Sequence, residues 1–194
     1  MARLKPLAAL WLVSDARNDA VLEAALAHLP RGSGFIFRHF HLPPVQRRAR
    51  FDALARIARA RDHLVILGGT TARARAWRAD GAYGSPRQLA SGPQGLRLAA
   101  VHSLRELAQA RRADLVLLSP AFATRSHPGA APLGRLRFRL LAARSQAPVI
   151  ALGGMNPRTA RRLDWPRWAA IDAFLRSGDS FELPVILSLS KEDS

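Results

Sequence analysis

The sequence predicts an α/β barrel of eight strands, and three observations carry this prediction. Short apolar runs alternate along the chain with amphipathic segments of helical period. The runs are continuously apolar rather than alternating, which is typical of parallel strands buried on both faces. Eight such repeats fit a (β/α)₈ TIM barrel, although 194 residues is short for this fold. A doubly wound open sheet is the alternative, but no G-x-G-x-x-G motif follows the first strand.

The first half of the chain supplies three strands. The first is buried and ends at Ser14-Asp15, and we expect Asp19 to cap the helix that follows and Pro30 and Gly32 to end it. An Arg-rich helix with one apolar face separates the second and third strands, and Gly68-Gly69-Thr70 opens the next helix. The predicted strands are 7–14, 34–38 and 63–67, and the Arg-rich helix is 44–60.

The second half repeats the pattern with shorter helices. Ser85-Pro86 begins a weak helix, Ser103 caps the next one, and Asn156 or Pro157 begins the last. The predicted strands are 79–83, 96–101, 114–118, 148–152 and 168–172, and a further helix is predicted over 133–143.

The barrel pattern stops after Phe174, so the C-terminal end is atypical for this fold. We predict a single barrel domain over residues 1–176 and a tail over 177–194. The tail holds a strand-like patch, 184–189, and a charged end, but no amphipathic eighth helix.

Composition narrows the class of protein. Apolar residues make up 48% of the chain, which argues against wholesale disorder, and the absence of cysteine fits a reducing compartment. The net charge of +16 is a feature of nucleic-acid-binding proteins. However, all but two of the 30 basic residues are arginines, they are scattered over helical segments, and few aromatic residues lie between them. We therefore expect solvated helix surfaces and no nucleic-acid partner.

The N-terminus imitates a signal peptide, since Lys5 precedes the apolar run LAALWLV. That run is too short to cross a membrane, and Asp15 follows it in place of a cleavage site. We interpret it as the first strand of a cytoplasmic protein without a membrane partner.

Two apolar runs end in loops suited to phosphate. They are DLVLLSPAFATRSHPG, residues 114–129, and PVIALGGMNP, residues 148–157. Small, hydroxyl and glycine residues before a helix offer backbone N–H groups to an anion. In a barrel both loops lie at the C-terminal face, where they would grip a phosphorylated small molecule. A plain left-handed turn is the alternative for Gly153 and Gly154, and loop ordering is the alternative for Thr124 and Ser126.

Several motifs resemble those of the thiamine-phosphate synthases and their TenI-like relatives. PAFATRSHPGAAPLG resembles the family's GPVFPTxTKPGxxPLG, and PVIALGG resembles PVVAIGG. WLVSD, FRH, ADG, LAAVHS and WAAIDAF resemble further family segments in the same order over residues 7–174. The resemblance implies a (β/α)₈ barrel that joins hydroxymethylpyrimidine diphosphate to thiazole phosphate, with Mg²⁺, and releases pyrophosphate.

The resemblance also implies the site residues. Arg38 and His127 would be catalytic, with Arg38 neutralising a diphosphate. Thr124 and Ser126 would hold pyrophosphate, Gly153 and Gly154 the thiazole phosphate. His102, at the end of the fifth strand, is a further candidate for substrate binding.

The chain departs from the family pattern at the metal site. Gly68-Gly69 stands where the family has Asn-Asp, and the loop at 85–88 holds no counterpart of the second aspartate. Phe40 stands in place of the family's lysine after the Arg38 strand, and Asp172 lies near a phosphate-binding serine position. We therefore assign no metal ligand, although the family implies Mg²⁺. A TenI-like, metal-free thiazole tautomerase or a non-catalytic binder of phosphorylated ligands is the alternative function.

Overall fold

The computed structural model describes residues 7–93, 95–124, 129 and 131–173. These residues form a closed barrel of parallel strands in the order β1 to β8, with β8 pairing back to β1. Closure confirms the (β/α)₈ prediction and excludes the open sheet. The strands are β1 (Leu10–Val13), β2 (Gly34–Phe37), β3 (Leu64–Gly68), β4 (Gly81–Gly84), β5 (Leu96–Val101), β6 (Leu115–Leu118), β7 (Val149–Ala151) and β8 (Trp168–Ala170).

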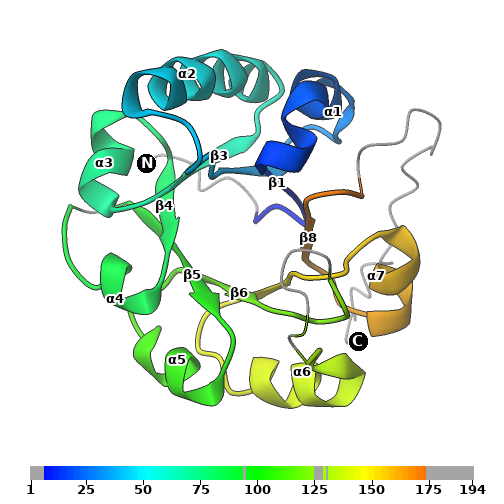
Figure 1. Cartoon of the computed structure of the whole chain (residues 1–194). Helices are drawn as coiled ribbons and strands as arrows, with labels where there is room; N and C mark the ends of the chain where they lie inside the picture. The colour runs from blue at the N-terminus through cyan, green and yellow to red at the C-terminus, as the bar shows by residue number, and fades with distance from the viewer. Residues whose placement is uncertain (1–6, 94, 125–128, 130, 174–194) are drawn as a thin grey trace, which may run out of the picture.

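Helical segments follow the strands and surround the central ring of the barrel (Figure 1). The longest, α2, has 17 residues, whereas α3 and α4 have 6 and 4. The described helical segments are the 3₁₀ helix η1 (Ala16–Val21), α1 (Leu22–His28), α2 (Pro44–Ala60), α3 (Thr71–Ala76), α4 (Pro86–Leu89), α5 (Leu104–Gln109), α6 (Gly134–Ala142) and α7 (Pro157–Leu163).

Three of the predicted helix caps are confirmed and one is wrong. Ser85, Ser103 and Asn156 each accept a hydrogen bond from a backbone amide in the first turn of α4, α5 and α7. Asp19 does not cap a helix, because the helical segment begins earlier, with η1, and Asp15 is its N-cap. The Asp19 carboxylate instead accepts hydrogen bonds from His39 and Arg50.

Two separate apolar cores hold the barrel together. The inner cluster consists largely of alternate strand residues, among them Trp11, Ile36, Ile66 and Ile150, and fills the barrel. The outer cluster joins the other strand faces to the helices. This double burial explains why the strands are continuously apolar in sequence.

Helix α2 departs from the expectation that the arginines lie on solvent faces. Arg47 is only 5% exposed and lies on the same face as the buried Phe51, Leu54 and Ala58. Its spacing to these residues follows the helical period, so the same pattern that buries them also buries Arg47.

No helix in the described ranges combines the length and apolar character that a membrane crossing requires. The predicted tail, 177–194, and the end of the predicted barrel domain lie outside the described residues.

Candidate active site at the barrel mouth

The C-terminal ends of the strands form one end of the barrel, the barrel mouth, and Arg38 lies there directly after β2. Ile36 belongs to the inner cluster, and strand alternation turns Arg38 toward the same side. The Arg38 Nε is buried and has no hydrogen-bond partner among the described residues. The Nε atoms of Arg61, Arg97 and Arg167 share this property, but these residues lie at the N-terminal ends of β3, β5 and β8. At the mouth, therefore, Arg38 is the arginine whose Nε is both buried and without a partner among the described residues.

Two polar side chains lie within electrostatic reach of Arg38. Burial raises the pKa of Tyr83 in β4, and the charge of Arg38 acts against this rise. Tyr83 is therefore a neutral hydrogen-bond donor at physiological pH. Burial acts to raise the pKa of Asp15, but hydrogen bonds from Arg17 and the weaker attraction of Arg38 hold that pKa below its ordinary value. Asp15 is engaged by Arg17 at 2.9 Å, so Arg38 keeps no direct ion pair with it.

An aromatic ring covers the end of β3. Phe40 is 61% exposed, and the Arg47 guanidinium carbon lies 4.8 Å from its ring centroid. A Cβ atom on Gly68 would lie 2.9 Å from the tip of this ring and 3.0 Å from the Phe37 carbonyl oxygen. Phe40 thus fills the space in which a side chain at position 68 would project.

The described residues at the mouth do not fit the Mg²⁺ that the family resemblance implies. Mg²⁺ is held by carboxylates with near-octahedral oxygen geometry. Gly69 offers no side chain, and in the loop after β4 Ser85 and Gln88 hydrogen-bond each other as a capping box. Asp172, after β8, lies 3.5 Å from Arg17. Within the described ranges, no cluster of three or more His, Cys, Asp or Glu side chains is arranged to hold a metal ion.

Gly153 and Gly154 bring the loop after β7 against the loop after β6. Their φ angles are +92° and +62°, and a Cβ atom would lie 2.8 Å from Pro120 Cα and 2.4 Å from the Ala123 carbonyl oxygen, respectively. Close approach of the two loops therefore requires glycine whether or not a ligand binds. The Gly153 and Gly154 amides donate to no acceptor in the described part of the chain, which makes them candidate donors to an anion.

Thr124 lies next to this contact, since it follows Ala123, whose carbonyl oxygen abuts Gly154. The structure thus brings Thr124 and the two glycines to the same part of the mouth. Ser126 and His127 lie outside the described residues, and their roles stay predictions.

His102 follows β5, and its side chain is turned toward α5. The backbone amide of His102 donates to the Glu106 carboxylate at 2.6 Å, and its Nδ1 lies 3.0 Å from the same carboxylate. The His102 side chain is 49% exposed. Its role in substrate binding stays a prediction.

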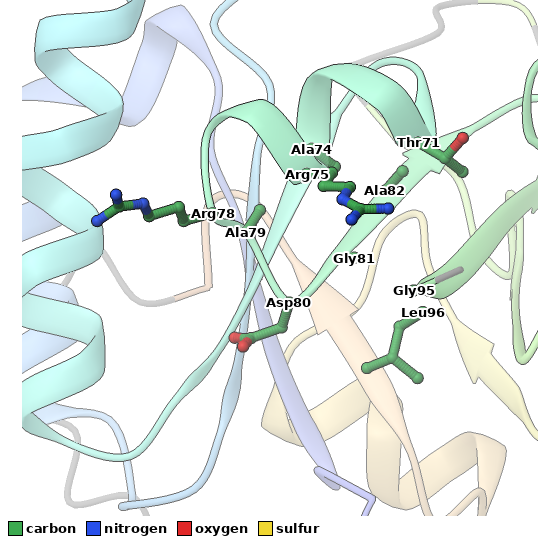
Figure 2. Close-up of a pocket in the computed structure, with 10 residues that line it drawn as sticks. All are labelled: Thr71, Ala74, Arg75, Arg78, Ala79, Asp80, Gly81, Ala82, Gly95 and Leu96. Carbon is green, nitrogen blue, oxygen red and sulfur yellow. The ribbon is translucent and has the colours of Figure 1, made fainter. Parts of the chain in front are cut away.

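A groove of about 280 Å³ lies away from the mouth, beneath α3 and beside β4 and β5 (Figure 2). Asp80, Gly81 and Leu96 line it, and these residues lie at the N-terminal ends of their strands. Barrel enzymes carry their chemistry at the opposite end. The groove is therefore not the candidate active site.

Tyr83 and Arg47 were not predicted as residues of the mouth, and Phe40 was named only as a departure from the family pattern. Tyr83 could have been found from strand alternation, since it lies two positions after Gly81, and Arg47 from the helical period of α2. Nothing in the sequence indicates that Phe40 lies over Gly68, because this contact joins two separate loops.

Comparison with known proteins identifies the family. The family model described as thiamine monophosphate synthase matches residues 10–164. A search of curated proteins found no match.

Solved structures show the same fold. Thiamine phosphate pyrophosphorylase from Pyrococcus furiosus is similar with a TM-score of 0.75 and 22% identity, over 91% of this chain and 92% of that one. Thiamine phosphate pyrophosphorylase from Bacteroides thetaiotaomicron is similar with a TM-score of 0.59 and 16% identity, over 90% of this chain and 88% of that one. Citrate synthase SbnG is similar with a TM-score of 0.57 and 9% identity, over 86% of this chain and 87% of that one. At these identities the likeness shows the fold alone, whereas the family model covers most of the strands, the glycine loop and the Arg38 position. The chain belongs to the thiamine monophosphate synthase family.

Proposed function

We propose that this protein binds the phosphate of a small heteroaromatic ligand, of which thiazole phosphate is the first candidate, at the barrel mouth without a divalent metal. In this respect it would be a TenI-like member of its family, working in the cytoplasm. The observation that carries the proposal is Arg38, a half-buried cation at the mouth whose Nε is buried and has no partner among the described residues. A guanidinium in such a place is suited to a phosphate or carboxylate.

Three further features support a phosphorylated ligand. The Gly153 and Gly154 amides have no acceptor among the described residues, and these glycines lie against the loop after β6 that leads to Thr124. The Tyr83 hydroxyl is neutral and near Arg38, so it adds a donor without adding charge. The exposed ring of Phe40 offers an apolar face for a planar ligand body. Ser126 and His127 would add further contacts to the phosphate, and His127, which stands where the family has a lysine, would be an acid or base.

Calorimetry with thiazole phosphate and thiamine phosphate tests the proposal, in buffer containing a chelator and again with Mg²⁺. We expect binding of at least one ligand, with the same affinity in both buffers. Arg38→Gln should weaken binding about tenfold or more, because the interaction lost is a hydrogen bond to a charged group. Arg167→Gln is the matched control, since its Nε is also buried without a described partner but lies before β8, at the other end of the barrel. Absence of heat from both ligands, or equal effects of the two variants, would overturn the proposal.

Thiamine-phosphate synthase activity is the second candidate, and the match of the family model favours it. That reaction transfers a group from a diphosphate, for which the family uses Mg²⁺, and the described mouth supplies no carboxylate cluster for this ion. Complementation of a strain that lacks thiamine-phosphate synthase separates the two candidates. Restored growth would establish the synthase, whereas binding of thiazole phosphate without growth is the expected result.

A further inference from the structure

The backbone of Arg38 is held from both sides. Its N–H donates to Ser14 Oγ at 2.8 Å, and its carbonyl oxygen accepts from Arg47 Nε at 2.9 Å. Arg47 also donates to the Gly68 carbonyl oxygen at 2.7 Å, which ties the end of β2 to the end of β3. These contacts fix the backbone from which the Arg38 side chain projects.

Ser14 is itself held by a series of polar contacts that leads from the buried His39 to the partly exposed Asp19 and Arg50. Its Oγ lies 2.8 Å from His39 Nδ1, and His39 Nε2 lies 2.7 Å from Asp19 Oδ1. Asp19 also accepts from Arg50 Nε at 2.8 Å. Ser14 and His39 are 0% and 1% exposed, so the polar atoms of these two side chains need hydrogen-bond partners within the protein.

The contacts define how protons are placed. Ser14 Oγ accepts from the Arg38 N–H, so its own proton is free to go to His39 Nδ1. His39 is then neutral, with its proton on Nε2 and directed at Asp19. Ser14, His39 and Asp19 have the composition of a hydrolase triad, but Ser14 is fully buried and both hydrogen-bonding sides of its hydroxyl are used. These three residues can position Arg38, but Ser14 cannot attack a substrate.

His39 adopts a backbone conformation that side chains rarely take. Its φ is +39°, and its ring stacks on Phe37 with centroids 4.7 Å apart and planes 6° from parallel. A left-handed residue next to the mouth persists only where its surroundings enforce it. Here the Ser14 contact, the Asp19 contact and the stacking enforce it together.

We propose that Ser14 and His39 are positioning residues that hold Arg38 for anion binding, that Asp19 keeps the proton of the neutral His39 on Nε2, and that protonation of His39 loosens this hold. The proposal rests on the proposed function of Arg38. If His39 Nδ1 gains a proton, it points that proton at Ser14 Oγ. The Ser14 hydroxyl proton then loses the acceptor that His39 gives it, and Oγ must accept from both His39 Nδ1 and the Arg38 N–H, which weakens its hold on the Arg38 N–H.

Charged and titratable groups face His39 from three directions. Asp19 lies on η1, Arg50 on α2 and His41 in the same loop, with the His41 ring centroid 5.0 Å from that of His39. The Arg47 guanidinium of α2 lies over the ring of Phe37, the same ring on which His39 stacks. Burial lowers the pKa of His39, Asp19 acts against this, and His41 and Arg50 add to it. The neutral form is therefore the one present at physiological pH, and its loss requires acid.

Three variants of the full chain test the proposal. Ser14→Ala removes the acceptor for the Arg38 N–H, and His39→Gln removes the acceptor for the Ser14 hydroxyl. His39→Asn keeps an acceptor near the Nδ1 position, cannot be protonated, and tolerates the left-handed backbone. The matched control is His63→Gln, because His63 is also a buried histidine, 1% exposed and bonded through Nε2 to the Leu26 carbonyl oxygen, but it precedes β3 at the far end of the barrel.

The first readout needs no ligand. Ser14→Ala and His39→Gln should speed hydrogen exchange of the Arg38 amide about fivefold or more, the effect of one lost hydrogen bond, whereas His39→Asn and His63→Gln should leave it near wild type. Unchanged exchange in both Ser14→Ala and His39→Gln would overturn the positioning role. Since this result does not depend on a ligand, it remains decisive even if the proposed function fails.

The second readout is the affinity for inorganic sulfate, which keeps its charge between pH 8 and pH 5. In the wild type and in His63→Gln, binding should weaken as the pH falls below about 6.5, the ordinary pKa of histidine. His39→Asn should abolish this weakening. A wild-type affinity that rises toward pH 5, or the same weakening in His39→Asn, would overturn the role of His39. If the wild type binds no sulfate at any pH, the proposed function fails and the amide exchange alone decides the positioning role.

Discussion

Replacement of Gly154 by alanine tests the contact between the two loops of the mouth. Gly154 has a φ of +62°, and an added Cβ would lie 2.4 Å from the Ala123 carbonyl oxygen and 2.9 Å from the Phe122 Cβ. Two costs therefore add. The left-handed conformation costs an alanine about 1 kcal/mol, and forcing apart closely packed groups costs about 1–3 kcal/mol more.

Gly32→Ala carries the cost of the left-handed conformation alone, so comparison with it isolates the cost of packing. Gly32 has a φ of +75°, but an added Cβ would meet nothing within 4 Å. We expect Gly32→Ala to lower the free energy of unfolding by about 1 kcal/mol and Gly154→Ala to lower it by about 2–4 kcal/mol. The difference between the two variants measures the packing of the loops after β6 and β7.

Urea unfolding followed by circular dichroism provides the assay, with equal slopes required of both variants so that the midpoints report stability. Equal destabilisation by the two substitutions would refute the reasoning, because it would show that the loop after β7 does not lie against Ala123. In that case Thr124 and the glycine amides would no longer be expected to act on one ligand.

Two further substitutions test the interior and the charged network. Gly34→Ala would place a Cβ 2.0 Å from the ring of the fully buried Trp11, and we expect a loss of about 3 kcal/mol in the free energy of unfolding, measured in urea; a neutral effect would contradict the described barrel interior. Arg50→Met removes the partner of Asp19 and Glu23 and should cost about 1 kcal/mol at pH 7, since these groups are partly exposed. The hydrogen bond from Arg50 lowers the pKa of Glu23, and for Asp19 the hydrogen bonds from Arg50 and His39 outweigh the upward effect of burial, so the wild type should lose this stability as the pH falls from about 4 through the lowered pKa values. Unfolding measured from pH 7 to pH 2 should show a smaller acid loss in Arg50→Met, and an identical loss in both proteins would contradict the assignment.

Much of the fold could be predicted because the strands are buried on both faces. Residues such as Trp11 and Leu12 face different cores and are both apolar, so each strand stands out as a continuous run. Helix bounds were predicted well where a cap or a proline fixes the first turn, as at Pro44 and Ser103. Asp19 was misplaced because a 3₁₀ segment precedes α1, and the apolar period of a helix does not show where such a segment begins.

The candidate site was predicted only in part, for a physical reason. Arg38 and the glycine loop are local features of one strand end each, so the sequence places them at the mouth as soon as the fold is known. The support of Arg38 is not local. Ser14 and Arg47 reach it from β1 and α2, and although the helical period indicates that Arg47 is buried, it does not show that Arg47 contacts Arg38. The position of Phe40 over Gly68 could not be predicted for the same reason, because it is a contact between two separate loops.

The central claim is that the barrel mouth binds a phosphate without a metal. A crystal structure of the full chain with thiazole phosphate, grown in the presence of a chelator, tests it most directly. We expect density for the phosphate at the mouth, within hydrogen-bond distance of the Gly153 and Gly154 amides or of the Arg38 guanidinium. Ligand density elsewhere, for instance in the groove beside Asp80, or binding that appears only when Mg²⁺ is added, would contradict it.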